Sequence, residues 1–160
     1  MRLQAAQDWN CRLGKIIPLI ARFLVLIDTN VWSELARPRP EPKVIAFLAA
    51  NRANCTLSTI VLAEMEYGIA KAIDATHRSR LIAFRNRIET LLIDRIIKPD
   101  EATAVVWGRL KAELERAGQI IADIDLLIAS QAIAAGIPVV TRNVSDFART
   151  GAAIINPWEP

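Results

Sequence analysis

The sequence is poor in the side chains that build disulfide frameworks and zinc sites. Its 160 residues include only two cysteines, Cys11 and Cys55, and one histidine, His77. Two cysteines do not make a disulfide framework, so we expect both thiols to be free and the protein to work in a reducing, cytoplasmic compartment. No set of Cys and His ligands is present for zinc. We interpret His77 as a surface residue.

Long apolar runs are missing as well. Residues 16–21 contain Pro18 and are followed by Arg22, so this stretch is too short to span a bilayer. It also lacks the longer apolar region and the cleavage site of a signal peptide. We expect no membrane partner, and we interpret residues 1–22 as an N-terminal extension, poorly ordered or helical, preceding a single domain at 23–160.

Neither sign of charge dominates the composition. The chain has 20 Lys and Arg against 17 Asp and Glu, a formal net charge of +3. This small excess is compatible with a polyanionic partner without establishing one. Apolar residues make up 52% of the chain and are spread along it, which excludes a disordered protein.

One carboxylate follows directly after a short run of apolar residues. Residues 23–27 are all apolar and are typical of a strand buried on both faces of a parallel sheet. Asp28 follows at the carboxyl end, where ligands bind in open α/β sheets. Thr29 or Asn30 could cap the next helix, but Asp28 is itself a common cap, so the residues alone leave its role open.

A second carboxylate comes from the helix after the strand predicted at Cys55–Ser58. Glu64 and Glu66 are two residues apart, about 200° around a helix, so they cannot both point into one site. We expect one to be functional and the other solvated. The buried face of this helix is predicted to include Ile60, Ala63 and Tyr67.

Arginines gather in two places. Arg37 and Arg39 lie in a proline-rich loop and could contact a phosphate backbone or keep the loop soluble; we favour the second interpretation. A helix predicted at 76–92 carries four more, which we also interpret as a solvated face: Arg78, Arg80, Arg85 and Arg87. With a second helix at 100–117, it is predicted to form an αα hairpin inserted in the α/β chain.

Two further acidic stretches follow. Asp123 is well placed as a helix cap, and Asp125 lies in the first helical turn among apolar residues, where a buried carboxylate needs a partner such as a metal ion. A strand predicted at 137–141 then delivers Thr141, Asn143 and Asp146 to the edge of the sheet that Asp28 occupies, if the strands are parallel.

Four carboxylates therefore converge at one end of one predicted sheet: Asp28, Glu64, Asp125 and Asp146. Their mutual repulsion raises pKa values or requires cations. A set of ligands that are all oxygens favours Mg²⁺ or Mn²⁺. A divalent cation held by carboxylates can catalyse the hydrolysis of a phosphodiester.

At this point the chain resembles a PIN-domain ribonuclease, and within that family the VapC toxins of toxin–antitoxin pairs. The resemblance covers about residues 23–158. Its marks are Leu-Ile-Asp28-Thr-Asn30, Ala-Glu64-Met-Glu-Tyr-Gly68, Ile-Asp125-Leu-Leu-Ile-Ala-Ser and Thr141-Arg-Asn143-Val-Ser-Asp146-Phe.

The resemblance implies roles for these residues. It selects Glu64 over Glu66 and Asp125 over Asp123, which leaves Asp123 as a cap or a supporting group. It makes the four acids catalytic, with Asp28, Asp125 and Asp146 binding the metal, and Asn30, Thr141 and Asn143 orienting carboxylates or water. The PIN-like nuclease domain would then be residues 23–160, a parallel sheet flanked by helices.

The resemblance also implies a function and partners. The protein would be a Mg²⁺-dependent endoribonuclease that leaves a 3′-hydroxyl and a 5′-phosphate, with tRNA and rRNA as candidate substrates. It would form a homodimer, be restrained by a cognate VapB-like antitoxin, and reach promoter DNA only through that antitoxin. Two alternatives stay open: a PIN-like nuclease acting on housekeeping RNA or DNA without an antitoxin, and a non-catalytic RNA-binding module.

Overall fold

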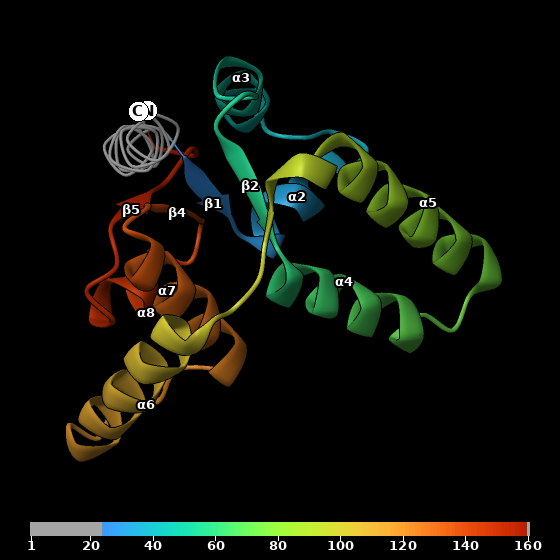
Figure 1. The fold of residues 1–160 in the computed structure, drawn as a ribbon. Coiled ribbons are helices and arrows are strands. Elements are labelled where there is room, and N and C mark those ends of the chain that lie inside the picture. The colour runs from blue at the N-terminus through green and yellow to red at the C-terminus, as the bar shows by residue number, and fades with distance from the viewer. Residues whose placement is uncertain (1–23, 160) are drawn as a thin grey trace, which may run out of the picture.

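The structure, a computed structural model, describes residues 24–159 and contains a five-stranded sheet with helices around it (Figure 1). The strands are β1 (Val25–Ile27), β2 (Cys55–Ser58), β3 (Ile96–Ile97), β4 (Val139–Val140) and β5 (Ile154–Ile155). They are ordered β3-β2-β1-β4-β5, and every neighbouring pair is parallel. The predicted α/β fold with a parallel sheet is confirmed.

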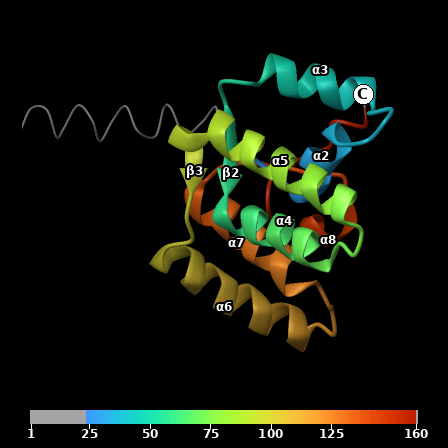
Figure 2. The same cartoon turned by 90° about the vertical axis from the view of Figure 1, so that its right-hand side faces the viewer.

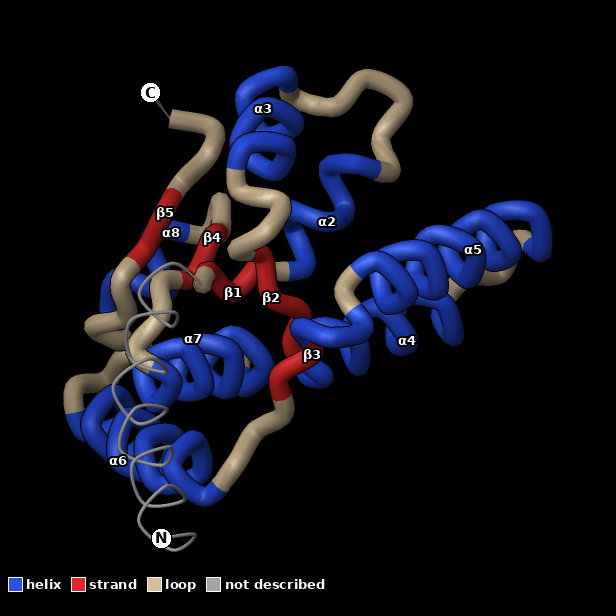
Figure 3. The backbone as a smooth tube through the Cα atoms, turned by 45° about the horizontal axis from the view of Figure 1, so that its top comes forward, coloured by secondary structure: helices blue, strands red, loops and turns tan. Residues whose placement is uncertain are grey.

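The helices cover both faces of this sheet. They are α2 (Thr29–Leu35), α3 (Pro42–Ala50), α4 (Thr59–Lys71), α5 (Ala75–Leu91), α6 (Glu101–Arg116), α7 (Asp123–Ala135) and α8 (Val144–Arg149), with a 3-10 turn η1 (Ile93–Arg95). Figure 3 shows α6 and α7 together on one side of the strands and α2 and α3 on the other, while α4 and α5 extend outward from the end of β2.

The central strand β1 decides where the site lies. Its three residues are buried, because β2 and β4 flank it and helices cover both faces. From β1 the chain builds outward through β2 and β3, and then crosses to β4 on the other side of β1. The carboxyl ends of β1 and β4 are therefore neighbours at the topological switch point, where open α/β sheets bind their ligands.

The helices predicted at 76–92 and 100–117 do not form a hairpin with each other, so that part of the prediction was wrong. The main helix partner of α5 is α4, and that of α6 is α7. Figure 2 shows α5 beside α4 and α6 beside α7, with β3 at one edge in the connection between α5 and α6. The reason is that β3 pairs with β2 and returns the chain to the sheet, after which the apolar side of α6 packs on Ile121 and Leu126.

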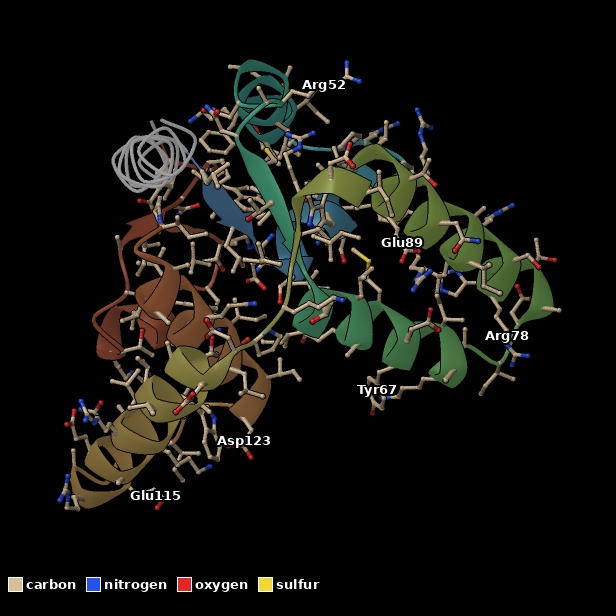
Figure 4. All side chains as sticks on the ribbon, in the orientation of Figure 1. Arg52, Tyr67, Arg78, Glu89, Glu115 and Asp123 are labelled. Atoms are coloured by element: carbon tan, nitrogen blue, oxygen red, sulfur yellow. The ribbon has the colours of Figure 1, made fainter. Side chains whose placement is uncertain are left out.

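The predicted buried face of α4 was also wrong in part. Ile60 is buried, but Ala63 is exposed and the Tyr67 side chain points away from the sheet (Figure 4). Burial on α4 is concentrated in its first turn, at Ile60, Val61 and Leu62, and of the later residues of this helix only Ile69 is buried. The predicted N-terminal extension, residues 1–22, lies outside the described residues. Between residues 24 and 159 no helix is long and apolar enough to cross a membrane.

Candidate active site at the switch point

Asp28 lies where β1 ends and is held by three hydrogen bonds. Its Oδ1 accepts from the Thr29 backbone N–H at 2.7 Å, and its Oδ2 accepts from Asn30 Nδ2 at 2.5 Å and from the Thr141 hydroxyl at 2.6 Å. The residue is both the cap of α2 and a side chain of the site, so the two roles left open by the sequence are compatible. Burial raises the pKa of Asp28, while the three donors act in the opposite direction.

Thr141 and Asn30 form the centre of a polar network around Asp28. Thr141 is fully buried at the end of β4, and its hydroxyl oxygen accepts from Asn30 Nδ2 at 3.0 Å and from the Asn143 backbone N–H at 2.9 Å. The side-chain oxygen Oδ1 of Asn30 accepts from the Arg142 backbone N–H at 3.2 Å. These contacts join the loop after β4 to the start of α2.

Glu64 enters the same site from α4. The Thr29 hydroxyl donates a hydrogen bond to its carboxylate. Burial raises the pKa of Glu64 and the charge of Asp125 adds to that rise, while the Thr29 hydrogen bond lowers it. Glu66, by contrast, has an exposed side chain whose Oε1 lies 2.9 Å from Arg85 Nε. The structure therefore places one glutamate of the pair in the site and the other on the surface.

Asp125 lies in the first turn of α7, half-buried. Its Oδ2 accepts from Asn143 Nδ2 at 3.1 Å. Burial is the main reason that the pKa of Asp125 rises to about 6, and the charges of Asp28 and Asp146 raise it further. These three carboxylates therefore share an electrostatic environment, although they come from positions 28, 125 and 146 of the chain.

Asp123 does not cap α7, so that prediction was wrong. The cap position is Ala122, and the exposed Asp123 carboxylate pairs with Lys111 of α6. Figure 4 shows Asp123 at the start of α7, beside α6. The pairing is a consequence of the close packing between α6 and α7, which the local sequence does not reveal.

Asp146 lies beside the other acids on α8. Its Oδ2 accepts from the same Asn143 nitrogen that bonds Asp125, at 2.9 Å, and its Oδ1 lies 3.2 Å from Arg149 Nη2. Asn143 therefore links two of the predicted acids directly.

Three of the predicted acids, Asp28, Glu64 and Asp125, line an open cavity of about 590 Å³, which we call the acidic cavity, whereas Asp146 is not among its lining residues. Its lining includes Asp28, Glu64, Asp125, Asn143, Arg37 and Trp158. Within residues 24–159, no three His, Cys, Asp or Glu side chains are grouped so that they could hold one metal ion together. The carboxylates of the cavity nevertheless suit a hard cation, because their negative charges repel one another and their oxygens are the ligands that such a cation prefers. Mg²⁺ in particular commonly binds only one or two carboxylates and keeps several waters.

A comparison with known families assigns this arrangement. Residues 25–153 match the family model of the PIN domain. The chain belongs to the PIN-domain family. It is 36% identical over 142 residues to the VapC ribonuclease Y4jK of Sinorhizobium fredii, which covers 86% of this chain and 99% of that relative. The predicted resemblance to VapC toxins is confirmed, and within the family the chain is of this ribonuclease type.

Solved structures agree with this assignment. A chain of the FitAcB structure from Neisseria gonorrhoeae superposes on this PIN-domain protein with a TM-score of 0.78 at 31% identity, covering 86% of this chain and 100% of that one. A chain of VapBC2 from Rickettsia felis, bound to a DNA fragment from its promoter, gives a TM-score of 0.72 at 30% identity, covering 83% and 98%.

Sequence reasoning missed several residues of the acidic cavity. Thr29 was considered only as a cap, yet its hydroxyl contacts Glu64, and its place directly after Asp28 at a strand end could have indicated this. Arg142 and Trp158 also line the cavity, with the guanidinium carbon 5.7 Å from the centre of the Trp158 ring. No local pattern marks Trp158, because it reaches the site only through the pairing of β5 with β4.

Proposed function

We propose that this PIN-domain protein is a Mg²⁺-dependent endoribonuclease toxin that hydrolyses RNA to a 3′-hydroxyl and a 5′-phosphate. The observation that carries the proposal is that Asp28, Glu64 and Asp125 line one open cavity at the switch point of the sheet. Its VapC relatives support RNA as the substrate. The family match at 25–153 supports residues 23–160 as the nuclease domain.

The cation would be held by Asp28 and Asp125, with Mn²⁺ as a substitute for Mg²⁺. Asp146 would join through water, because Asn143 lies between it and Asp125 in the structure. When bound, such a cation supplies charge neutralisation at the phosphate and a lower pKa for the attacking water.

The residues of the chain supply orientation and proton transfer. Thr29, Asn30 and Thr141 hold the Asp28 carboxylate in one orientation. Glu64 would accept the proton of the attacking water, since the Thr29 hydroxyl positions its carboxylate and burial raises its pKa above the ordinary value, which makes it a stronger base. The water oxygen bonds to phosphorus, the bond from phosphorus to O3′ breaks, and O3′ takes a proton from solvent.

Cleavage of RNA by the purified protein tests this proposal. We expect Mg²⁺ to support cleavage, EDTA to abolish it, and Asp125→Asn to abolish it while the fold is retained. Asp123→Asn is the matched control, because it removes an exposed acid two residues away and should cleave normally. End-labelling of the fragments should find 5′-phosphates. Equal cleavage by Asp125→Asn and the unmodified protein would contradict the assignment, and RNA binding without cleavage would favour a non-catalytic module.

We further propose a VapB-like antitoxin as the cytoplasmic partner. A second cavity of about 420 Å³, which we call the helical groove, lies between α2, α4 and α5 and shares Thr29 and Glu64 with the acidic cavity. Its lining includes the apolar side chains of Met65, Leu81 and Phe84. An amphipathic antitoxin segment could pack there and extend an arginine toward the carboxylates.

Co-expression with a VapB-like antitoxin, sought as a small reading frame beside this gene, would test the antitoxin proposal. We expect a stable complex that no longer cleaves RNA, and we expect Leu81→Glu in the groove to prevent its formation. Promoter binding should require the antitoxin. Sedimentation should show a homodimer of the toxin alone. A toxin that stays active at saturating antitoxin would contradict this part of the proposal.

A further inference from the structure

Two arginines line the acidic cavity together with its carboxylates. Arg37 follows α2, and Arg142 follows β4. The guanidinium of Arg142 lies over Trp158, whereas that of Arg37 is paired with a carboxylate, at 3.0 Å between Arg37 Nη1 and Glu34 Oε2. The two members of this pair differ strongly in exposure: the Arg37 side chain is 56% exposed and the Glu34 side chain 4%.

Glu34 is a buried acid that the proposed reaction does not use. A buried carboxylate must be compensated by hydrogen bonds or an opposite charge. Here one oxygen accepts from the Glu41 backbone N–H at 3.0 Å and the other contacts Arg37. A single buried side chain thus anchors the far end of the 37–41 loop and the arginine at its start.

The backbone also restricts where Arg37 can go. Its N–H donates to the Glu34 carbonyl oxygen at 3.2 Å, and Pro38 follows it immediately. Proline fixes its own φ and limits the conformations of the residue before it. Arg37 is therefore held at one place by its backbone, its neighbour and its ion pair, and within residues 24–159 Glu34 is the one polar partner of its guanidinium.

We propose that Arg37 binds a backbone phosphate of the RNA and that Glu34 is the positioning residue that holds Arg37 for this contact. This inference rests on the proposed function. RNA entering the acidic cavity meets the charges of Asp28, Glu64 and Asp125, so a cation at the cavity wall favours its approach. Arg37 lines both the acidic cavity and the helical groove, so it lies where a single RNA strand could pass from the cavity into the groove. A guanidinium with free donors matches a phosphate well.

Steady-state cleavage of a short single-stranded RNA of mixed sequence tests the assignment. For Arg37→Gln we expect KM to rise about tenfold, the effect of one lost charge-assisted contact. The slope of log kcat/KM against log salt should become shallower by about 1. Arg39→Gln is the matched control, because Arg39 is an exposed arginine of the same loop that lines neither cavity.

A double-mutant cycle separates the positioning role of Glu34 from a purely structural one. Glu34→Gln keeps the shape and the acceptor for the Glu41 N–H but removes the charge. We expect it to raise KM in the presence of Arg37 and to have no further effect in Arg37→Gln. Urea unfolding of each variant shows that the fold is retained. Effects of the two substitutions on KM that simply add would overturn the role assigned to Glu34.

Direct binding keeps this inference distinct from the proposed function. Fluorescence anisotropy of the labelled RNA is measured in the Asp125→Asn background, where no cleavage is expected. If RNA binding depends on Arg37 while the protein with Asp125 intact does not cleave RNA, that result supports the phosphate site and contradicts the proposed nuclease activity. Active cleavage with Arg37→Gln and Arg39→Gln indistinguishable in KM and salt slope overturns the phosphate site alone. A protein that neither binds nor cleaves RNA contradicts both.

Discussion

The Thr141 hydroxyl donates a hydrogen bond of 2.6 Å to the Asp28 carboxylate, although 113 positions separate the two residues in the chain. The contact exists because β1 and β4 are neighbours in the sheet, with Ile27 in register with Val140. Both residues are buried, at 3% and 0% exposure, so the bond is shielded from water. It ties the strand that carries the first acid to the strand that leads to Asn143 and Asp146.

Removing this donor should weaken both the site and the fold. Thr141→Val keeps the shape of the side chain but leaves Asp28 with one donor fewer, at a cost of about 1–3 kcal/mol in the free energy of unfolding. We expect kcat/KM to fall by about 10- to 100-fold, the usual effect of losing a side chain that orients a metal ligand. Thr150→Val, which removes a buried hydroxyl bonded to the Phe147 carbonyl oxygen, should lower stability but not activity. Equal activity of both variants would refute this role of Thr141.

Stability without metal should depend on pH through Asp125. Its pKa rises from 3.8 in the unfolded chain to about 6 in the fold, so the folded protein binds the proton more tightly. The resulting stabilisation is complete below the unfolded pKa and is lost as pH rises through the folded value. In EDTA, Asp125→Asn should therefore gain stability over the unmodified protein between these two pH values. Urea unfolding across that range would show it, and parallel curves for the two proteins would count against the shift.

Divalent cations should reverse this effect at neutral pH. Mg²⁺ binds the ionised carboxylates of the folded state and stabilises it by mass action, so Tm should increase with Mg²⁺ concentration. The increase should disappear in Asp28→Asn and in Asp125→Asn but persist in Asp123→Asn. Differential scanning calorimetry at several Mg²⁺ concentrations provides the measurement. A Tm that rises equally in all four proteins would indicate nonspecific ion effects.

The two glutamates of α4 should differ sharply in kinetics. Glu64→Gln removes the proposed proton acceptor, so kcat should fall by about 100-fold or more. Glu66→Gln removes only an exposed partner of Arg85, and such surface pairs contribute about 0–1 kcal/mol to stability. Single-turnover cleavage at saturating enzyme isolates the chemical step. Comparable losses in the two variants would exclude Glu64 as the specific acceptor.

Local patterns in the sequence were sufficient for the strand ends and the acids that follow them. Residues 25–27 are apolar because helices cover both faces of the sheet, so the strand and the position of Asp28 could be read directly. The order of the acids and of their flanking residues was also sufficient to identify the family, since each motif lies within one short segment of the chain.

Tertiary structure decided everything that depends on which segments meet. The pairing of α5 with α4, the outward direction of Tyr67 and the ion pair of Asp123 with Lys111 all depend on how separate elements pack against one another, even where those elements are consecutive in the chain. The same holds for Glu34, whose burial turns an ordinary helix-end acid into the anchor of Arg37. Periodicity describes one element at a time, whereas a binding site forms from the free energy gained when several elements pack together.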